Sequence, residues 1–147
     1  MTFKRIIAEV FLKMIAIFHS TLSRKNKLST NKIFILRNNG LGDLLCITPL
    51  FEILKKRFPE SKIVVGIGDW HKDLLDGNPN IDKQIRVNAP WHNQFTGEFN
   101  ILTIFKYILF SPEIKKLRLY NFDIGIDILG SFWGSFLLLR LNIPRRF

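Results

Sequence analysis

Residues 32–59 read KIFILRNNGLGDLLCITPLFEILKKRFP, and this stretch decides the fold. Residues 32–36 form a short, continuously apolar run, which is typical of a strand buried on both faces of a parallel sheet. The turn at 37–42 contains two glycines and two asparagines, the residues that best tolerate positive φ. Thr48 and Pro49 then predict the start of a helix. The stretch therefore predicts a strand, a turn and a helix, the first unit of an α/β fold.

Strands and helices continue to alternate after this unit. The pattern predicts strands at 62–67, 83–87 and 122–129, and helices at 70–75, from about 99 with a break at Ser111-Pro112, and at 130–141. Such alternation indicates a doubly wound, Rossmann-like parallel sheet with flanking helices. Ligands of such sheets bind outside the carboxyl ends of the strands. The loops expected to matter are therefore 37–43, 68–70, 88–92 and 127–130.

The sequence predicts which side of the first helix faces the core, but it leaves the start of the helix undecided. The inward stripe is expected at Leu50, Ile53, Leu54 and Phe58. Whether 43–47 adds an earlier helical turn stays open, because Pro49 lacks the N–H that a continuous hydrogen-bond ladder needs.

Composition limits the class of protein. The chain has 147 residues, 47% of them hydrophobic, which is the size of one domain with a real core. Its single cysteine, Cys46, excludes an internal disulfide and a multi-cysteine zinc site. Cys46 has apolar neighbours and is expected to be a buried, inert thiol. The net charge of +10 implies an anionic partner, namely nucleic acid, a phosphorylated glycolipid or an acidic membrane surface.

Residues 1–31 form a basic leader and linker ahead of the domain at 32–147. Up to Lys32 the chain has seven basic residues and one acidic residue, so this part carries +6 of the net charge. Apolar residues recur every three or four positions from Phe3 to Phe18, which predicts an amphipathic helix too charged to span a membrane. Two interpretations stay open: the helix binds an anionic membrane surface, or it packs on another part of the protein or on a partner.

The turn at 37–42 is a poor dinucleotide site. Gly40 and Gly42 supply two glycines of a Gly-x-Gly-x-x-Gly motif, but Leu45 occupies the third position. Asp43 stands where a diphosphate would approach, so no cofactor site is predicted here.

Asp43 itself has two interpretations. It caps a helix or turn, or it is a general base whose negative charge is stabilised by backbone N–H groups at a helix start.

The run at 33–59 resembles the opening of glycosyltransferase family nine, the lipopolysaccharide heptosyltransferases. The spacing Gly42-Asp43-x-x-x-x-Thr48-Pro49 is its most specific element. The resemblance continues, in order, through 62–67, 74–82, 120–130 and 143–146, and it covers nearly everything from Lys32 to the end.

The resemblance implies the acceptor-side, N-terminal half of a two-domain GT-B fold, with the donor-binding C-terminal domain expected to be absent from this chain. It implies that Asp43 is the catalytic base of an inverting, metal-independent transfer from a nucleotide sugar to a lipid-linked glycan. Residues expected to bind or shape the acceptor site share the strand ends: Arg37, Asn39, Gly40, Gly42, Thr48, Trp70 and Asp127. Neither a cofactor nor a metal is expected.

The family resemblance also implies a place and partners. The enzyme would act on a lipopolysaccharide-type or other cell-surface glycan at the cytoplasmic face of a bacterial inner membrane, as a peripheral protein. The alternative is a non-catalytic remnant that binds an acceptor or a membrane. Binding of nucleic acid is not expected, because no base-reading motif accompanies the charge.

Several candidate residues keep open roles. His71 and His92 have no further ligand at metal spacing, so surface or acceptor-contact roles are expected. Arg37 contacts an anionic acceptor or pairs with a carboxylate, and Asp127 contacts acceptor hydroxyls or stabilises its turn. Trp70 and Trp91 stack on sugar rings or belong to the core. Leu129 and Trp133 depart from the family, which has a polar residue and often a basic one near these positions.

Overall fold

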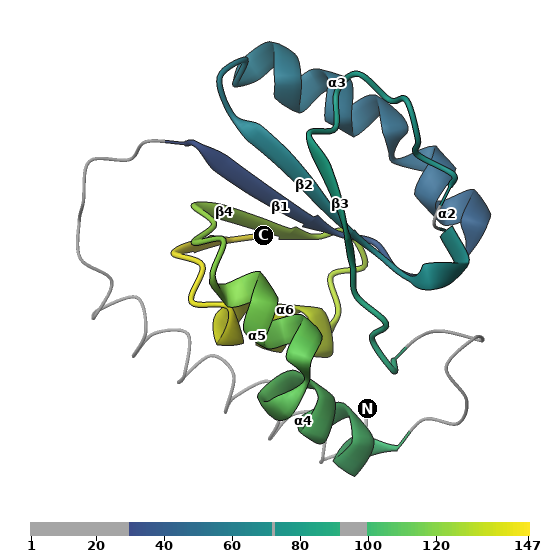
Figure 1. Ribbon diagram of the computed structural model, residues 1–147, viewed down its shortest axis with the longest axis vertical. Helices are drawn as coiled ribbons and strands as arrows, with labels where there is room; N and C mark the ends of the chain where they lie inside the picture. Colours follow the sequence, from purple (N-terminus) through teal and green to yellow (C-terminus); the bar gives the residue numbers. More distant parts are fainter. Residues whose placement is uncertain (1–29, 72, 92–99) are drawn as a thin grey trace.

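The computed structural model describes residues 30–71, 73–91 and 100–147, and within them the chain forms a five-stranded sheet (Figure 1). Every strand pair is parallel, and the order across the sheet is β3-β2-β1-β4-β5. The strands are β1 (Lys32–Leu36), β2 (Lys62–Ile67), β3 (Lys83–Arg86), β4 (Ile124–Asp127) and β5 (Arg145–Arg146). The predicted Rossmann-like α/β fold is confirmed, whereas the predicted leader helix lies outside the described residues.

The strand order reverses direction at β1. From β1 the chain moves outward to β2 and β3, then crosses back to place β4 on the other side of β1. The carboxyl ends of β1 and β4 therefore form the topological switch point, where open α/β sheets bind their ligands.

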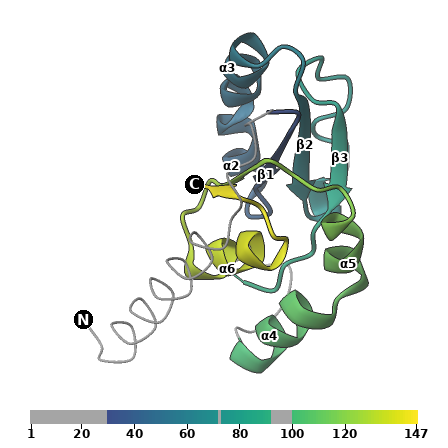
Figure 2. The same cartoon turned by 90° about the vertical axis from the view of Figure 1, so that its left-hand side faces the viewer.

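Helices cover both faces of the sheet (Figures 1 and 2). One face carries α2 (Leu41–Cys46) and α3 (Thr48–Arg57), and the other carries α4 (Ile101–Phe110), α5 (Pro112–Arg118) and α6 (Phe132–Arg140). Successive residues of β1 point to opposite faces, so Ile33 and Ile35 join the core under α2 and α3. Phe34 and Leu36 join the core under α4, α5 and α6. No helix within the described residues is both long and apolar enough to cross a bilayer.

The helical phase after β1 differs from the expectation. A separate helix, α2, precedes α3, and the residue that caps α3 is Ile47 rather than Thr48. Phe51 is fully buried while Ile53 is 61% exposed, so the predicted stripe was wrong at Ile53. Cys46 is exposed, which corrects the expectation of a buried thiol.

Three other elements also differ. Asp69–His71 is a single 3-10 turn, η1, rather than the helix expected at 70–75. The fourth strand, β4, is shorter than predicted. The short edge strand β5 was not predicted.

Candidate functional site

Asp43 lies on the first helix after β1, at the carboxyl edge of the sheet. Gly40 caps α2 with extended backbone, and its N–H donates to Asp43 Oδ2 at 3.3 Å. Asp43 thus takes part in helix capping, as one of its two interpretations requires. Its side chain is nevertheless 52% exposed. The carboxylate therefore keeps accepting capacity on the solvent side, which a general base needs.

Arg37 fixes the other carboxylate oxygen of Asp43. Its Nη2 lies 3.0 Å from Asp43 Oδ1, and its side chain is only 11% exposed. The backbone of Arg37 is held by β2, because its N–H donates to the carbonyl of Gly66 at 3.0 Å. The buried Nε has no hydrogen-bond partner. Of the two roles expected for Arg37, the structure shows pairing with a carboxylate.

Asp127 ends β4 and faces inward. It is 7% exposed, and its carboxylate accepts hydrogen bonds from the backbone N–H groups of Leu129 and Ser131 and from the Ser131 hydroxyl. Burial raises the pKa of Asp127, while the two Ser131 bonds and the charge of Arg37 oppose that rise. Most of its accepting capacity is used within the turn. The geometry favours turn stabilisation over the predicted contact with acceptor hydroxyls.

The Asp127 turn also needs a glycine on α6. A Cβ built at Gly134 would lie 2.0 Å from Asp127 Oδ2, far inside van der Waals contact. The Ser131 hydroxyl also accepts from the N–H of Gly134 at 2.9 Å, so the start of α6 and the carboxylate form one unit.

Trp70 connects the end of β2 to the turn after β1. Its indole Nε1 donates to the carbonyl of Asn39 at 3.1 Å. The ring lies against Gly68, where an added Cβ would come within 2.2 Å of it. Trp70 is only partly buried, so it is not a fully buried core residue, and stacking on a sugar ring stays a prediction.

His71 is buried directly behind the Asp43 turn. It is 1% exposed, and neither ring nitrogen makes a hydrogen bond of ordinary geometry. Burial lowers the pKa of His71, and the nearby backbone of Gly40 and charge of Asp43 partly oppose this. The expected surface position of His71 is wrong, because the residue is almost completely buried, whereas acceptor contact stays a prediction.

An open hollow of about 390 Å³ lies between the start of α2 and η1. Its lining combines two leucines, a tryptophan and polar groups: Leu41, Asp69, Trp70, His71, Asp73 and Leu74. An aromatic ring beside carboxylates suits a sugar ring, which offers an apolar face and hydroxyl donors.

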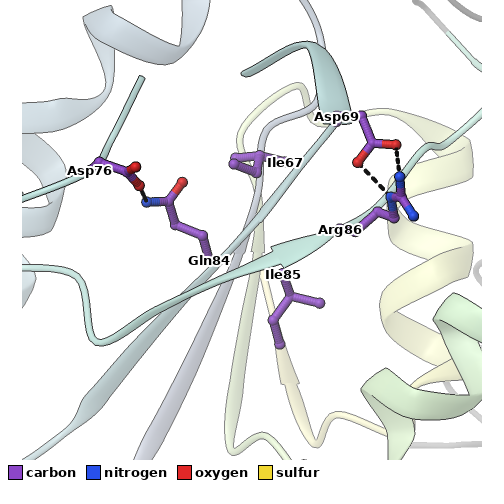
Figure 3. Close-up of a pocket in the computed structure, with 7 residues that line it drawn as sticks. Ile67, Asp69, Asp76, Gln84, Ile85 and Arg86 are labelled. Carbon is purple, nitrogen blue, oxygen red and sulfur yellow. Dashed lines mark hydrogen bonds and ion pairs between the residues drawn. The ribbon is translucent and has the colours of Figure 1, made fainter. Parts of the chain in front are cut away.

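A smaller hollow of about 170 Å³ opens between the ends of β2 and β3 (Figure 3). Asp69 forms a two-pronged ion pair with Arg86, and Gln84 donates to Asp76 at 2.9 Å. The two acidic groups thus have partners inside the hollow. Asp69 lines both hollows and joins them into one polar edge.

Sequence reasoning missed a hydrogen-bond network behind this edge. Asn88 donates to Asp69 Oδ2 at 2.9 Å, and its backbone N–H donates to Glu113 Oε2 at 3.0 Å. Tyr107 donates its hydroxyl to the same Glu113 oxygen at 2.6 Å, and burial is the main reason that its pKa is raised. The network fixes the end of β3 to α4 and α5. Its members are far apart in sequence and form no local motif.

The remaining expectations concern single residues and a metal site. The Thr48 hydroxyl donates to the carbonyl of Leu45 at 2.9 Å, so it shapes the junction of α2 and α3. Trp91 is 2% exposed and packs edge-on against Tyr107, which places it in the core. His92 lies outside the described residues. Among residues 30–71, 73–91 and 100–147, no three His, Cys, Asp or Glu residues gather as metal ligands.

Comparison with known proteins reveals two curated relatives. Lipooligosaccharide heptosyltransferase 2 of Haemophilus ducreyi is 26% identical over 78% of this chain and 30% of its own length. Lipopolysaccharide heptosyltransferase 3 of Escherichia coli is 29% identical over 71% of this chain and 27% of its own length. The chain thus spans less than a third of the relatives that it matches. No protein-family model matches it.

Two solved structures share the fold. E. coli ADP-heptose LPS heptosyltransferase II superposes with a TM-score of 0.60 at 22% identity, over 78% of this chain and 29% of the other. The family 9 glycosyl transferase of Veillonella parvula gives a TM-score of 0.63 at 23% identity, over 84% and 33%. Together with the curated relatives, these likenesses relate the chain to one part of the heptosyltransferases of glycosyltransferase family nine.

Proposed function

We propose that the chain is the acceptor-side part of a glycosyltransferase and that Asp43 is its general base. The supporting observation is the position of Asp43. It lies at the carboxyl end of β1, at the switch point, with its carboxylate oriented by Arg37 and half open to solvent. The hollow with Trp70 lies next to the same helix start. The heptosyltransferase relatives agree with a sugar-transfer function.

The proposed reaction has one displacement step. An acceptor hydroxyl loses its proton to Asp43, and its oxygen forms a bond to the anomeric carbon of the donor sugar. The bond from that carbon to the nucleoside diphosphate breaks on the opposite face, so the configuration inverts and the electron pair leaves with the diphosphate. No metal is invoked. Arg37 orients the carboxylate and neutralises part of the charge around it.

The donor would be a nucleotide sugar, and groups beyond this chain would hold its diphosphate. The named relatives suggest ADP-heptose as the first donor to try and a lipopolysaccharide-type glycan as the acceptor. A membrane-anchored acceptor agrees with a peripheral protein at the inner face of the cytoplasmic membrane, and with the basic residues at 1–31.

A substitution at Asp43 tests the proposal. The chain would be joined to the donor-binding part of a heptosyltransferase and assayed for transfer from ADP-heptose to a heptose-deficient lipopolysaccharide. Asp43→Asn should lower kcat by about 100-fold or more, since the amide cannot accept the proton. Glu60→Gln, at an exposed carboxylate just before β2 on the opposite edge of the sheet, is the matched control and should retain near-normal turnover. Near-normal turnover of Asp43→Asn would contradict the base assignment.

The second candidate function is a binding module, favoured by the hollow that Trp70 lines beside the start of α2. In that case the chain binds the acceptor, but the fused protein transfers nothing. Calorimetry with the acceptor saccharide and the transfer assay together separate the two, because binding without transfer supports the module and transfer supports the enzyme.

A further inference from the structure

Helix α4 is apolar over most of its circumference, including positions that face away from the core. Its sequence is ILTIFKYILF, and Lys106 is the only charged residue among its ten positions. Ile104 and Ile108 are fully buried in the core beneath α4, α5 and α6. A surface helix of a water-soluble domain would place charged residues on the side away from that core. In α4 the outer side is apolar as well, so the fold alone does not explain it.

The outer side of α4 leaves large apolar groups exposed. Leu102 is 78% exposed, Phe110 is 65% exposed, and Ile101 is 53% exposed. Phe105 is also accessible and meets Trp133 and Phe136 of α6, with ring centroids 5.4 and 5.7 Å apart. We call these residues the α4–α6 apolar surface: Ile101, Leu102, Phe105, Phe110, Trp133 and Phe136. A contiguous surface of this kind marks an interaction site more often than scattered apolar residues do.

The opposite face of the sheet provides an internal comparison. Ile53 on α3 is 61% exposed, but its helix also carries Glu52, Lys55, Lys56 and Arg57. A single apolar residue among charges is normal on a protein surface. Of the exposed residues of α4, only Thr103 and Lys106 are polar, whereas the other four are large and apolar.

Positive charges lie on α4 itself and on the helix that follows it. Lys106 is exposed on α4, and Lys115, Lys116 and Arg118 are exposed on α5, which follows after a single residue. The one acidic residue of the two helices, Glu113, is engaged by Tyr107 and Asn88. An occupant must therefore offer an apolar phase together with negative charge. The strongly basic segment at 1–31 fits poorly, since it carries the same sign of charge.

We propose that the α4–α6 apolar surface docks on an anionic lipid bilayer, with α4 lying in the interface. Apolar side chains enter the boundary of headgroups and acyl chains, while lysine and arginine meet lipid phosphates. Helix α6 begins directly after the Asp127 turn, so docking brings the carboxyl edge of the sheet close to the bilayer. The proposal rests on the proposed function only in expecting a membrane-anchored acceptor, and it is tested without any transfer reaction.

Vesicle co-sedimentation of the full chain tests the proposal. Vesicles of phosphatidylcholine are compared with vesicles that also contain phosphatidylglycerol. The chain should bind the anionic vesicles, and the double variant Leu102→Glu/Phe110→Glu should reduce the partition coefficient by about tenfold or more, because it places carboxylates where acyl chains would be met. Both positions are exposed, so circular dichroism and the urea midpoint should stay close to wild type. Ile53→Glu on α3 is the matched control and should bind normally.

Two further measurements identify which part of the chain binds the vesicles. Lys115→Glu/Lys116→Glu should weaken binding to anionic vesicles and reduce its dependence on salt. Brominated lipids should quench the fluorescence of Trp133, which a Trp133→Phe variant isolates by difference. Unchanged binding of the Leu102/Phe110 variant, with loss of binding in Phe11→Glu, would overturn the proposal in favour of the leader. Absence of vesicle binding together with concentration-dependent self-association would overturn it in favour of a second copy of this chain.

Discussion

Two aspartates stand at neighbouring strand ends of this sheet, and their surroundings differ sharply. Asp43 follows β1 with its side chain 52% exposed, one close ion pair and one long hydrogen bond from Gly40. Asp127 ends β4 at 7% exposure and accepts three hydrogen bonds from its own turn. It also packs against Gly134, where an added Cβ would overlap its carboxylate. Arg37 affects both, as an ion-pair partner of Asp43 and as a distant positive charge for Asp127.

The difference separates a group available for chemistry from a group used by the fold. A carboxylate whose accepting positions are filled by fixed donors has little capacity left for a substrate proton. A carboxylate with a single partner at each oxygen and half of its side chain exposed is oriented and keeps accepting positions for a substrate proton. In the proposed function, the Asp127 turn stabilises the fold and Asp43 stays available to the substrate.

The largest effect is expected at Gly134. Gly134→Ala should lower the free energy of unfolding by about 2–5 kcal/mol, since the new Cβ overlaps Asp127 Oδ2 and forces the carboxylate away from Ser131. Urea denaturation measures the change. Gly42→Ala is the matched control on the Asp43 side, where a Cβ meets nothing within 4 Å. It should be neutral or stabilising by up to about 1 kcal/mol. Equal losses of unfolding free energy in Gly134→Ala and Gly42→Ala would contradict the proposal that the Asp127 turn stabilises the fold more than the Asp43 turn does.

Removing each carboxylate charge should give a smaller but unequal effect. Asp127→Asn should cost about 1–3 kcal/mol, because an amide nitrogen replaces one acceptor in a buried turn. Asp43→Asn should cost less than about 1 kcal/mol, since its side chain is half exposed and the amide oxygen can still accept a hydrogen bond from Arg37. Thermal and urea unfolding of the two variants side by side provide the comparison. A greater loss at Asp43 would reverse the assignment of roles.

The pH dependence of stability should reveal His71 behind the Asp43 turn. Burial lowers its folded-state pKa below the ordinary value of 6.5, so the unfolded chain takes up the proton more readily. Its contribution to stability is therefore present above that value and is lost as the pH falls through the lower, folded-state pKa. Between about pH 7.5 and about pH 5.5, wild type should lose more stability than His71→Gln, which has no such titration. Parallel pH profiles of the two proteins would show that His71 is not the titrating group.

The first strand, turn and helix could be predicted from the local sequence pattern. The side of the helix that faces the core could not. The apolar run of β1, the glycines after it and Pro49 were sufficient to predict strand, turn and helix. Phe51 was missed because it faces the core together with Leu44, seven residues earlier. That spacing marks one helical face only if α2 precedes α3, and the sequence left this open. Ile53 was consequently assigned to the wrong side.

Other features of the site depend on contacts between segments that are far apart in the sequence. Asp43 was predictable from its place after β1 and from the family resemblance. The burial of His71 was not, since a single histidine in a polar stretch carries no periodic signal. The network of Asp69, Asn88 and Glu113 joins three different strand and helix ends. Only the folded sheet brings these ends together, so spacing along the chain could not reveal them.

The central claim is that the edge near Asp43 binds a glycan, and amide chemical-shift mapping tests it most directly. The full chain would be titrated with the saccharide released from a heptose-deficient lipopolysaccharide. Shifts should concentrate at 37–43 and 69–71, including the indole N–H of Trp70, with smaller changes at 127–131. Binding should persist in Asp43→Asn. No saturable shifts, or shifts confined to residues away from this edge, would contradict the account.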